Sequence, residues 1–122
     1  MNKFTVIFYE DENGEKPVEE FLLSLDKKMR AKILGILGIL EEKGNTLREP
    51  YSKPLGDGIF EVRCKIGTDL TRVLYFFYYE GHIILTNGFV KKTQKTPKQV
   101  IQLAKKRRTD YIERSQNNED AQ

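Results

Sequence analysis

Five cationic side chains have types and spacing that suit phosphate chemistry. They are Arg63 in an alternating segment, Arg72 before an aromatic run, and Lys91, Lys92 and Lys95 in the connection "FVKKTQKTP". Arginine presents a planar fork of donors that matches phosphate oxygens, and lysine offers a compact charge whose pKa falls when it is desolvated or surrounded by cations. These residues predict a phosphate site in which arginines hold the group and lysines exchange protons.

Other reaction chemistries have few candidate residues. The chain has one histidine, His82, and one cysteine, Cys64. His82 lies at a predicted hairpin turn, and Cys64 falls on the apolar side of its segment, where a small buried core residue is expected. No His, Cys and Asp cluster suits zinc, and no glycine-rich loop precedes a helix. We therefore expect a function that uses no metal and no cofactor.

The length of the chain predicts a single domain. We expect residues 1–114 to form that domain and the polar residues 115–122 to be a disordered tail. No run of 18 apolar residues is present, and the N-terminal segment does not read as a signal peptide. Because a lone cysteine excludes an internal disulfide, these features together predict a cytoplasmic protein without membrane association.

Positive charge is concentrated towards the C-terminus. Residues 91–114 carry nine Lys or Arg and two Asp or Glu, a net of +7, whereas residues 1–50 carry eight and ten, a net of −2. Such asymmetry indicates an acidic or polyanionic partner, and a merely solvated basic helix is the alternative.

The N-terminal half predicts one strand and a helical hairpin. β-Branched and aromatic residues at 3–9 predict the strand. Pro17 suits the first turn of a helix, and Asp26 suits the N-cap of a second helix over 27–43. The segment 45–58 reads as a loop because of its Pro, Gly and Asn content.

The C-terminal half predicts three strands and a final helix. Tight turns separate the strand segments 59–66, 71–79 and 82–90, which predicts an antiparallel meander. The final helix is expected to begin at a capping box in which Thr96 is the N-cap and Pro97 the first helical residue. The predicted fold is α+β, in the order β-α-α-β-β-β-α, with a four-stranded antiparallel sheet and the helices packed on one side.

The meander brings distant cations together. Each tight connection reverses the chain, so Arg63, Arg72 and the Lys91/Lys92 pair are expected at one end of the sheet. The competing interpretation is that each arginine forms a structural ion pair, Arg63 with Glu61 or an acid on a neighbouring strand and Arg72 with Asp69. In that interpretation the lysines at 91, 92 and 95 are merely solvated.

Two long segments resemble a known family. "IFEVRCKIGTDLTRVLYFF" and "IILTNGFVKKTQKTPKQVIQLAKKRRTDY" are similar to the HigB-like, phage-derived branch of the RelE/ParE type II toxin superfamily. The features that carry the resemblance are Glu61 with Arg63, Arg72 with Tyr75, the string from Gly88 to Pro97, and the basic run from Ala104 to Arg108. The resemblance implies a RelE-like fold.

The resemblance also implies a function and partners. Such a toxin enters the ribosomal A site and cleaves mRNA as a metal-independent endoribonuclease. A helix-turn-helix antitoxin, HigA-like, neutralises it in a heterodimer or heterotetramer. A ParE-like gyrase poison, a non-catalytic nucleic-acid-binding module and an inactive toxin held by its antitoxin are the alternatives.

The expected roles follow from the chemistry of RNA cleavage. The 2′-OH must be deprotonated and aligned, the charge on phosphorus stabilised and the 5′-oxygen protonated. We expect Arg63 and Arg72 to clamp the phosphate and Lys91 or Lys92 to act as general base or acid. Glu61 is expected to orient Arg63, and the alternative role for Glu61 is that of general base. The expected RNA-binding residues are Lys53, Lys65, Lys95 and Lys98.

Overall fold

The computed structural model describes residues 3–120. Its helices and strands follow the order β1 (Thr5–Phe8), α1 (Pro17–Ser24), α2 (Lys27–Lys43), β2 (Ser52–Gly56), β3 (Ile59–Ile66), β4 (Asp69–Tyr78), β5 (His82–Lys91) and α3 (Lys98–Asp120), with single 3-10 turns at Gly44–Thr46 and Tyr79–Gly81. The α+β class is confirmed, whereas the predicted order of elements differs from the observed one because it lacks β2.

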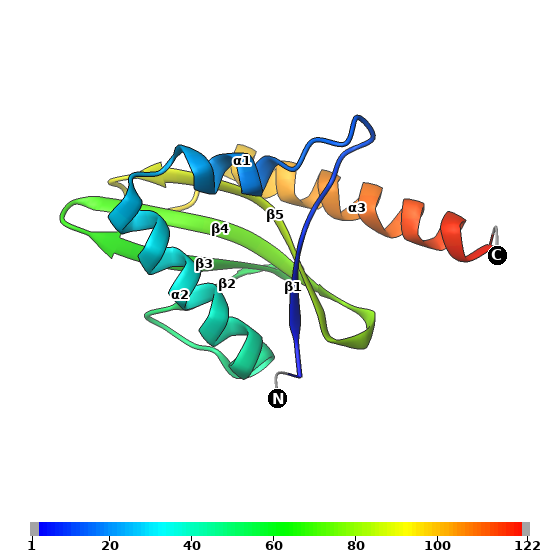
Figure 1. Cartoon of the computed structure of the whole chain (residues 1–122), viewed down its shortest axis with the longest axis horizontal. Coiled ribbons are helices and arrows are strands. Elements are labelled where there is room, and N and C mark those ends of the chain that lie inside the picture. The colour runs from blue at the N-terminus through cyan, green and yellow to red at the C-terminus, as the bar shows by residue number, and fades with distance from the viewer. Residues whose placement is uncertain (1–2, 121–122) are drawn as a thin grey trace.

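The sheet has five strands rather than the predicted four. Its order is β1-β5-β4-β3-β2, and β1 pairs with β5 in parallel, so the sheet is mixed (Figure 1). The segment 45–58, predicted to be a loop, contains β2. Its Pro54 and Gly56 are residue types typical of turns, which is why the sequence did not predict a strand there. An edge strand tolerates proline because one side of its backbone needs no ladder partner, and Gly56 lies at a bulge in the pairing with β3.

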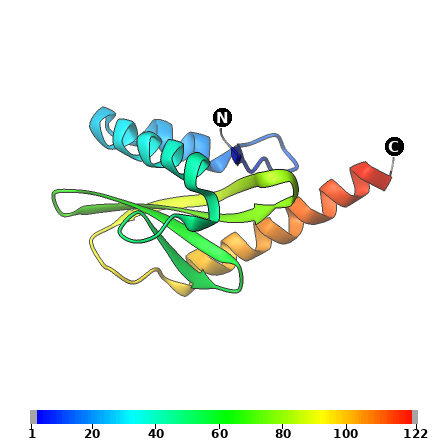
Figure 2. The same cartoon turned by 90° about the horizontal axis from the view of Figure 1, so that it is seen from below.

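Helices cover both faces of the sheet, which corrects the prediction that all of them pack on one side. The hairpin of α1 and α2 lies over one face, and α3 crosses the other (Figures 1 and 2). The first core contains Val18, Ile33 and Val73, and the second contains Leu74, Phe76 and Ala104. Strand β4 is buried on both faces, which its long aromatic run allows.

The helical hairpin follows the sequence closely. Helix α2 spans the predicted residues, and the Asp26 carboxylate accepts a 2.9 Å bond from the Met29 N–H, as an N-cap should. The apolar stripe of α2 is buried at Met29, Ile33, Ile36, Leu37 and Leu40. Arg30 completes the hairpin, because its guanidinium donates to the carbonyls of Leu22, Leu23 and Leu25 at the end of α1.

Helix α3 begins later and ends later than expected. It starts at Lys98, and the Pro97 carbonyl accepts from the Val100 and Ile101 N–H groups at 3.1 and 3.3 Å. At its other end the helix continues through residues 115–120, within the segment predicted to be a disordered tail. Each residue added to an existing helix gains a hydrogen bond, so polar residues can extend it. The division into domain and tail stays a prediction.

Candidate functional site

A row of side chains crosses three strands on the sheet face that α3 covers. Arg63 on β3 lies directly opposite Arg72 on β4, and Arg72 lies opposite Phe89 on β5. Residues opposite one another in an antiparallel pair share a face, so the two guanidinium groups emerge side by side. The Arg72 guanidinium carbon also lies 5.1 Å from the Phe89 ring centroid, a cation–π contact.

The carboxylate of Glu61 serves both arginines. Its Oε2 lies 3.3 Å from Arg63 Nε and 3.8 Å from Arg72 Nε. Glu61 and Arg72 are 1% and 0% exposed, and the Arg63 side chain is 15% exposed. The prediction that Glu61 contacts Arg63 is confirmed, whereas the Asp69 partner considered for Arg72 is replaced by Glu61. One buried negative charge therefore faces two positive charges.

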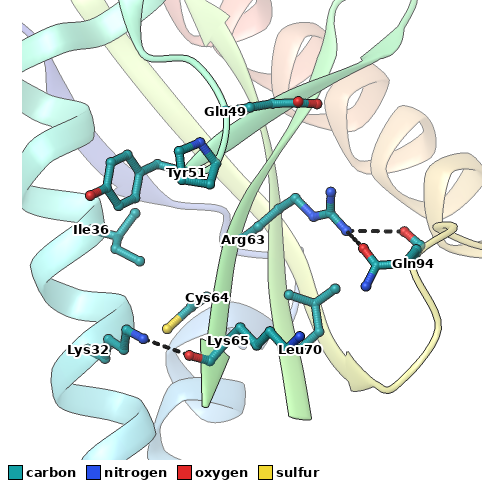
Figure 3. Close-up of a pocket in the computed structure, with 10 residues that line it drawn as sticks. Lys32, Ile36, Glu49, Tyr51, Arg63, Cys64, Lys65, Leu70 and Gln94 are labelled. Carbon is teal, nitrogen blue, oxygen red and sulfur yellow. Dashed lines mark hydrogen bonds between the residues drawn. The ribbon is translucent and has the colours of Figure 1, made fainter. Parts of the chain in front are cut away.

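The loop between β5 and α3 covers the arginine pair. Arg72 donates through Nη2 to the Thr93 carbonyl. Arg63 donates to Gln94 Oε1 at 2.9 Å, as Figure 3 shows. The buried Thr96 hydroxyl donates to Glu61 Oε1. The prediction that Thr96 caps α3 is therefore wrong, because its hydroxyl donates to a carboxylate on β3 instead of accepting from the first turn of the helix. The loop closes over the site by offering oxygens to the arginines and a donor to the glutamate.

Burial dominates the electrostatics of Arg72. Desolvation lowers the pKa of this guanidinium from its ordinary value, the Glu61 carboxylate opposes that shift, and the Arg63 charge adds to it. Within residues 3–120, Arg72 Nε and Nη1 have no hydrogen-bond partner. Buried donors without acceptors are costly, so the arrangement suits an additional anionic ligand.

The predicted lysines lie around this centre. Lys53 is opposite Glu61 in the β2–β3 pairing, while Lys65 and Lys91 are both opposite Leu70, so all three share the arginine face. Three further lysines are exposed, two in the covering loop and one at the start of α3: Lys92, Lys95 and Lys98. The structure therefore groups the cations at one end of the sheet, and their roles in catalysis and RNA binding stay predictions.

Part of the basic run on α3 has a structural use. Arg107 donates to the Thr86 carbonyl on β5 at 2.8 Å. Lys105 and Arg108 lie 3.4 and 3.3 Å from the Asp57 carboxylate in the β2–β3 turn. Because these residues attach α3 to the sheet, the net charge of the C-terminal segment overstates the charge that is free to bind a partner.

Sequence reasoning missed the oxygens that complete the site. Thr93 and Gln94 lie within the quoted connection, but the lysines beside them suggested solvent or RNA contacts instead. Phe89 belongs to the same connection, and the sequence predicts only that it is part of a strand, not that its ring contacts Arg72. A signal was available at Thr96, since a polar residue that precedes a helix can turn its hydroxyl either to the helix or to a neighbour.

The cysteine behaves as a core residue rather than as a nucleophile. Cys64 is buried, its thiol lies 3.6 Å from Met29 Sδ, and burial raises its pKa, which opposes thiolate formation.

Among the residues that the structure describes, no three His, Cys, Asp or Glu side chains gather as metal ligands. The described helices include none with the length and apolarity needed to cross a bilayer.

Fold and site together define a small α+β protein whose sheet carries a covered arginine pair. The family model of phage-derived, Gp49-like proteins (DUF891) matches residues 20–109, which include the site. The chain belongs to this Gp49-like family, which includes RelE/HigB-like toxins. No curated protein matches the chain with significance.

Proposed function

We propose that this protein is the toxin of a type II toxin–antitoxin system and cleaves mRNA on the ribosome, as a HigB-like member of the RelE/ParE superfamily. Membership of the Gp49-like family supports the toxin class. A helix-turn-helix antitoxin of the HigA type is its proposed partner, in a heterodimer or heterotetramer.

The arginine pair is the observation that carries this proposal. Arg63 and Arg72 share the single carboxylate of Glu61, which leaves one excess positive charge in a largely buried position. An excess buried charge is unfavourable unless a ligand of opposite sign arrives. A phosphodiester that gains negative charge during cleavage is such a ligand, and preorganised guanidinium donors stabilise that charge.

The chemistry requires only groups that the site contains. The ribose 2′-oxygen loses its proton to a base and attacks phosphorus, forming a 2′,3′-cyclic phosphate while the bond to the 5′-oxygen breaks. The leaving 5′-oxygen takes up a proton and becomes a 5′-hydroxyl end. In this proposal Arg63 and Arg72 hold the phosphate, Lys91 or Lys92 exchanges the protons, and Glu61 orients both arginines.

The covering loop must move before RNA reaches Arg72. Arg72 is fully buried, and the Thr93 carbonyl already occupies one of its donors. A phosphate group is a stronger partner than a neutral backbone carbonyl, because it carries negative charge and can accept two parallel hydrogen bonds from one guanidinium. RNA binding is therefore proposed to exchange loop oxygens for phosphate oxygens at the same guanidinium groups.

The test compares toxicity and RNA cleavage in cells that express single variants. We expect Arg63→Gln and Arg72→Met to lower cleavage by about 10²–10³-fold, the usual cost of losing one transition-state donor. Methionine keeps much of the buried volume of Arg72, and circular dichroism verifies that each variant folds. The matched control is Lys28→Gln, which removes an exposed cation on α2, away from the site.

The readouts separate the competing functions. Mapping of mRNA 5′ ends should show 5′-hydroxyl cuts with wild type and control, and pulse labelling should show that protein synthesis stops first. Early arrest of DNA synthesis without cut mRNA would indicate a gyrase poison. Salt-sensitive RNA binding without any cleavage would indicate a binding module. Either result would contradict the proposed activity.

A further inference from the structure

A pocket lies beside the arginine pair, at the edge of β3 that β2 leaves uncovered. Strand β2 begins at Ser52, opposite Val62, so residues 63–66 of β3 extend beyond it. The pocket has a volume of about 420 Å³ and lies between α2, the turn at residues 49–51 and the loop at Gln94 (Figure 3). This volume falls in the range of about 300–1,000 Å³ that is usual for small-molecule sites.

The uncovered edge offers backbone groups to this pocket. The Arg63 N–H donates to the Tyr51 carbonyl at 2.8 Å, which shows that Arg63 directs its backbone groups to this side. Residues two apart along a strand direct their backbone groups the same way, so the Lys65 N–H also faces this edge. The Lys65 carbonyl confirms the direction, because it accepts from Lys32 Nζ at 2.6 Å (Figure 3).

The lining of the pocket carries excess positive charge. Lys32, Arg63 and Lys65 contribute three cations, and Glu49 is the one carboxylate among the lining residues. Lys32 makes its hydrogen bond to a backbone carbonyl rather than to an acid, so its charge is not neutralised there. A phosphate group matches this combination of ammonium, guanidinium and backbone N–H donors.

The other walls of the pocket suit a nucleobase. Ile36, Pro50 and Leu70 provide apolar surface, and Tyr51 is 43% exposed. A partly exposed aromatic ring beside cationic groups is the arrangement on which bases stack, with a contribution that does not require a particular base. Charge and apolar surface in one pocket therefore fit a whole nucleotide better than an isolated phosphate ion.

Arg63 joins this pocket to the site described above. Its guanidinium contacts Glu61 at one side and Gln94 at the other, and both Arg63 and Gln94 line the pocket. We infer that the pocket binds the nucleotide next to the phosphate that Arg63 and Arg72 hold, with its base on Tyr51 and its own phosphate near Lys32 and Lys65. The placement beside a cleaved phosphate rests on the proposed function, whereas nucleotide binding itself does not.

Adenosine monophosphate is the probe for this pocket, followed by amide NMR shifts of the whole chain. We expect shifts at Tyr51, Lys65 and neighbouring residues, and a loss of affinity of about fivefold or more in Tyr51→Ala, as for other stacked bases. Lys32→Gln should also weaken binding. Tyr79→Ala is the matched control, because Tyr79 is an exposed tyrosine (74%) in the β4–β5 turn and does not line the pocket.

The outcomes distinguish this inference from the proposed function. Arg72→Met should retain binding of the probe while losing RNA cleavage, because Arg72 does not line the pocket. Nucleotide binding by a wild type that never cleaves RNA would overturn the proposed function and support the pocket. Unchanged affinity in both Tyr51→Ala and Lys32→Gln would overturn the pocket. Equal affinity for inorganic phosphate and the nucleotide would overturn the stacking on Tyr51.

Discussion

Arg63 and Arg72 are direct partners in the β3–β4 register, and both contact the same Glu61 carboxylate. Like charges opposite one another in a sheet repel, so this pairing needs a compensating negative group. Glu61 compensates one of the two charges, and oxygens of the covering loop solvate the pair. The relationship is unfavourable for folding alone, which is the reason to assign it a binding role.

Removal of the shared carboxylate should destabilise the protein strongly. Glu61→Gln leaves two facing guanidinium groups without a buried counter-charge, and a loss of about 3–5 kcal/mol in the free energy of unfolding is expected. Urea denaturation measures the loss. The double variant Glu61→Gln/Arg72→Met should recover part of it, because it removes one of the uncompensated charges. A single variant as stable as wild type would show that the carboxylate is not needed as a counter-charge.

The Thr96 hydroxyl should hold the covering loop closed. Thr96→Val keeps the shape of the side chain but removes its hydrogen bond to Glu61, at a cost of about 1.5–3 kcal/mol for a bond to a charged group. We expect faster amide hydrogen exchange at residues 93–96 and unchanged exchange at Val73 in the core of β4. Thr68→Val, in the exposed β3–β4 turn, is the control. Unchanged loop exchange in Thr96→Val would mean that other contacts close the loop.

The contact between Tyr9, the residue after β1, and helix α3 should make stability depend on pH. The Arg114 guanidinium and the Tyr9 hydroxyl donate to Asp110 at 2.7 and 2.6 Å, and they lower the pKa of that carboxyl. A depressed folded-state pKa stabilises the protein above the unfolded pKa, near 4, and this contribution is lost as pH falls through the folded pKa.

Comparison with Asp110→Asn isolates this effect. Wild type should be more stable than the variant at pH 7, by about 1 kcal/mol or less because the ion pair is more than one-third exposed. Thermal unfolding at a series of pH values measures the difference, which should disappear in acid. A difference that stays constant from pH 7 to well below pH 3 would contradict this account.

Glycines on α2 and β5 should respond to alanine in opposite ways. Gly35 and Gly38 are exposed inside α2, and a Cβ at either position meets nothing within 4 Å. Gly35→Ala and Gly38→Ala should each raise the free energy of unfolding by about 1 kcal/mol, because alanine favours a helix interior.

Gly88 is the contrasting position, in the string that carries the family resemblance. A Cβ there would lie 2.5 Å from the Phe21 ring of α1 and 3.1 Å from the Arg72 carbonyl. Gly88→Ala should therefore destabilise the protein by about 1–3 kcal/mol through overpacking. Urea midpoints of the three alanine variants, measured together, should show two increases and one decrease.

The sequence determined the parts of this protein that depend on neighbouring residues. The apolar stripe and Asp26 cap placed α2 correctly, and the alternation of 59–66 placed β3. The one short turn between β3 and β4 also decided that Arg63 and Arg72 meet, because a tight reversal leaves little freedom in register. Each of these features arises from interactions within a few residues along the chain.

The tertiary structure decided what depends on surfaces formed by distant segments. It placed β1 in parallel beside β5, made an edge strand of Ser52–Gly56, and sent α3 across the face opposite the helical hairpin. It also turned the Thr96 hydroxyl to Glu61 and closed the loop over Arg72. No local pattern encodes these choices, because each depends on which sheet edge, face or buried charge the rest of the chain leaves to be covered.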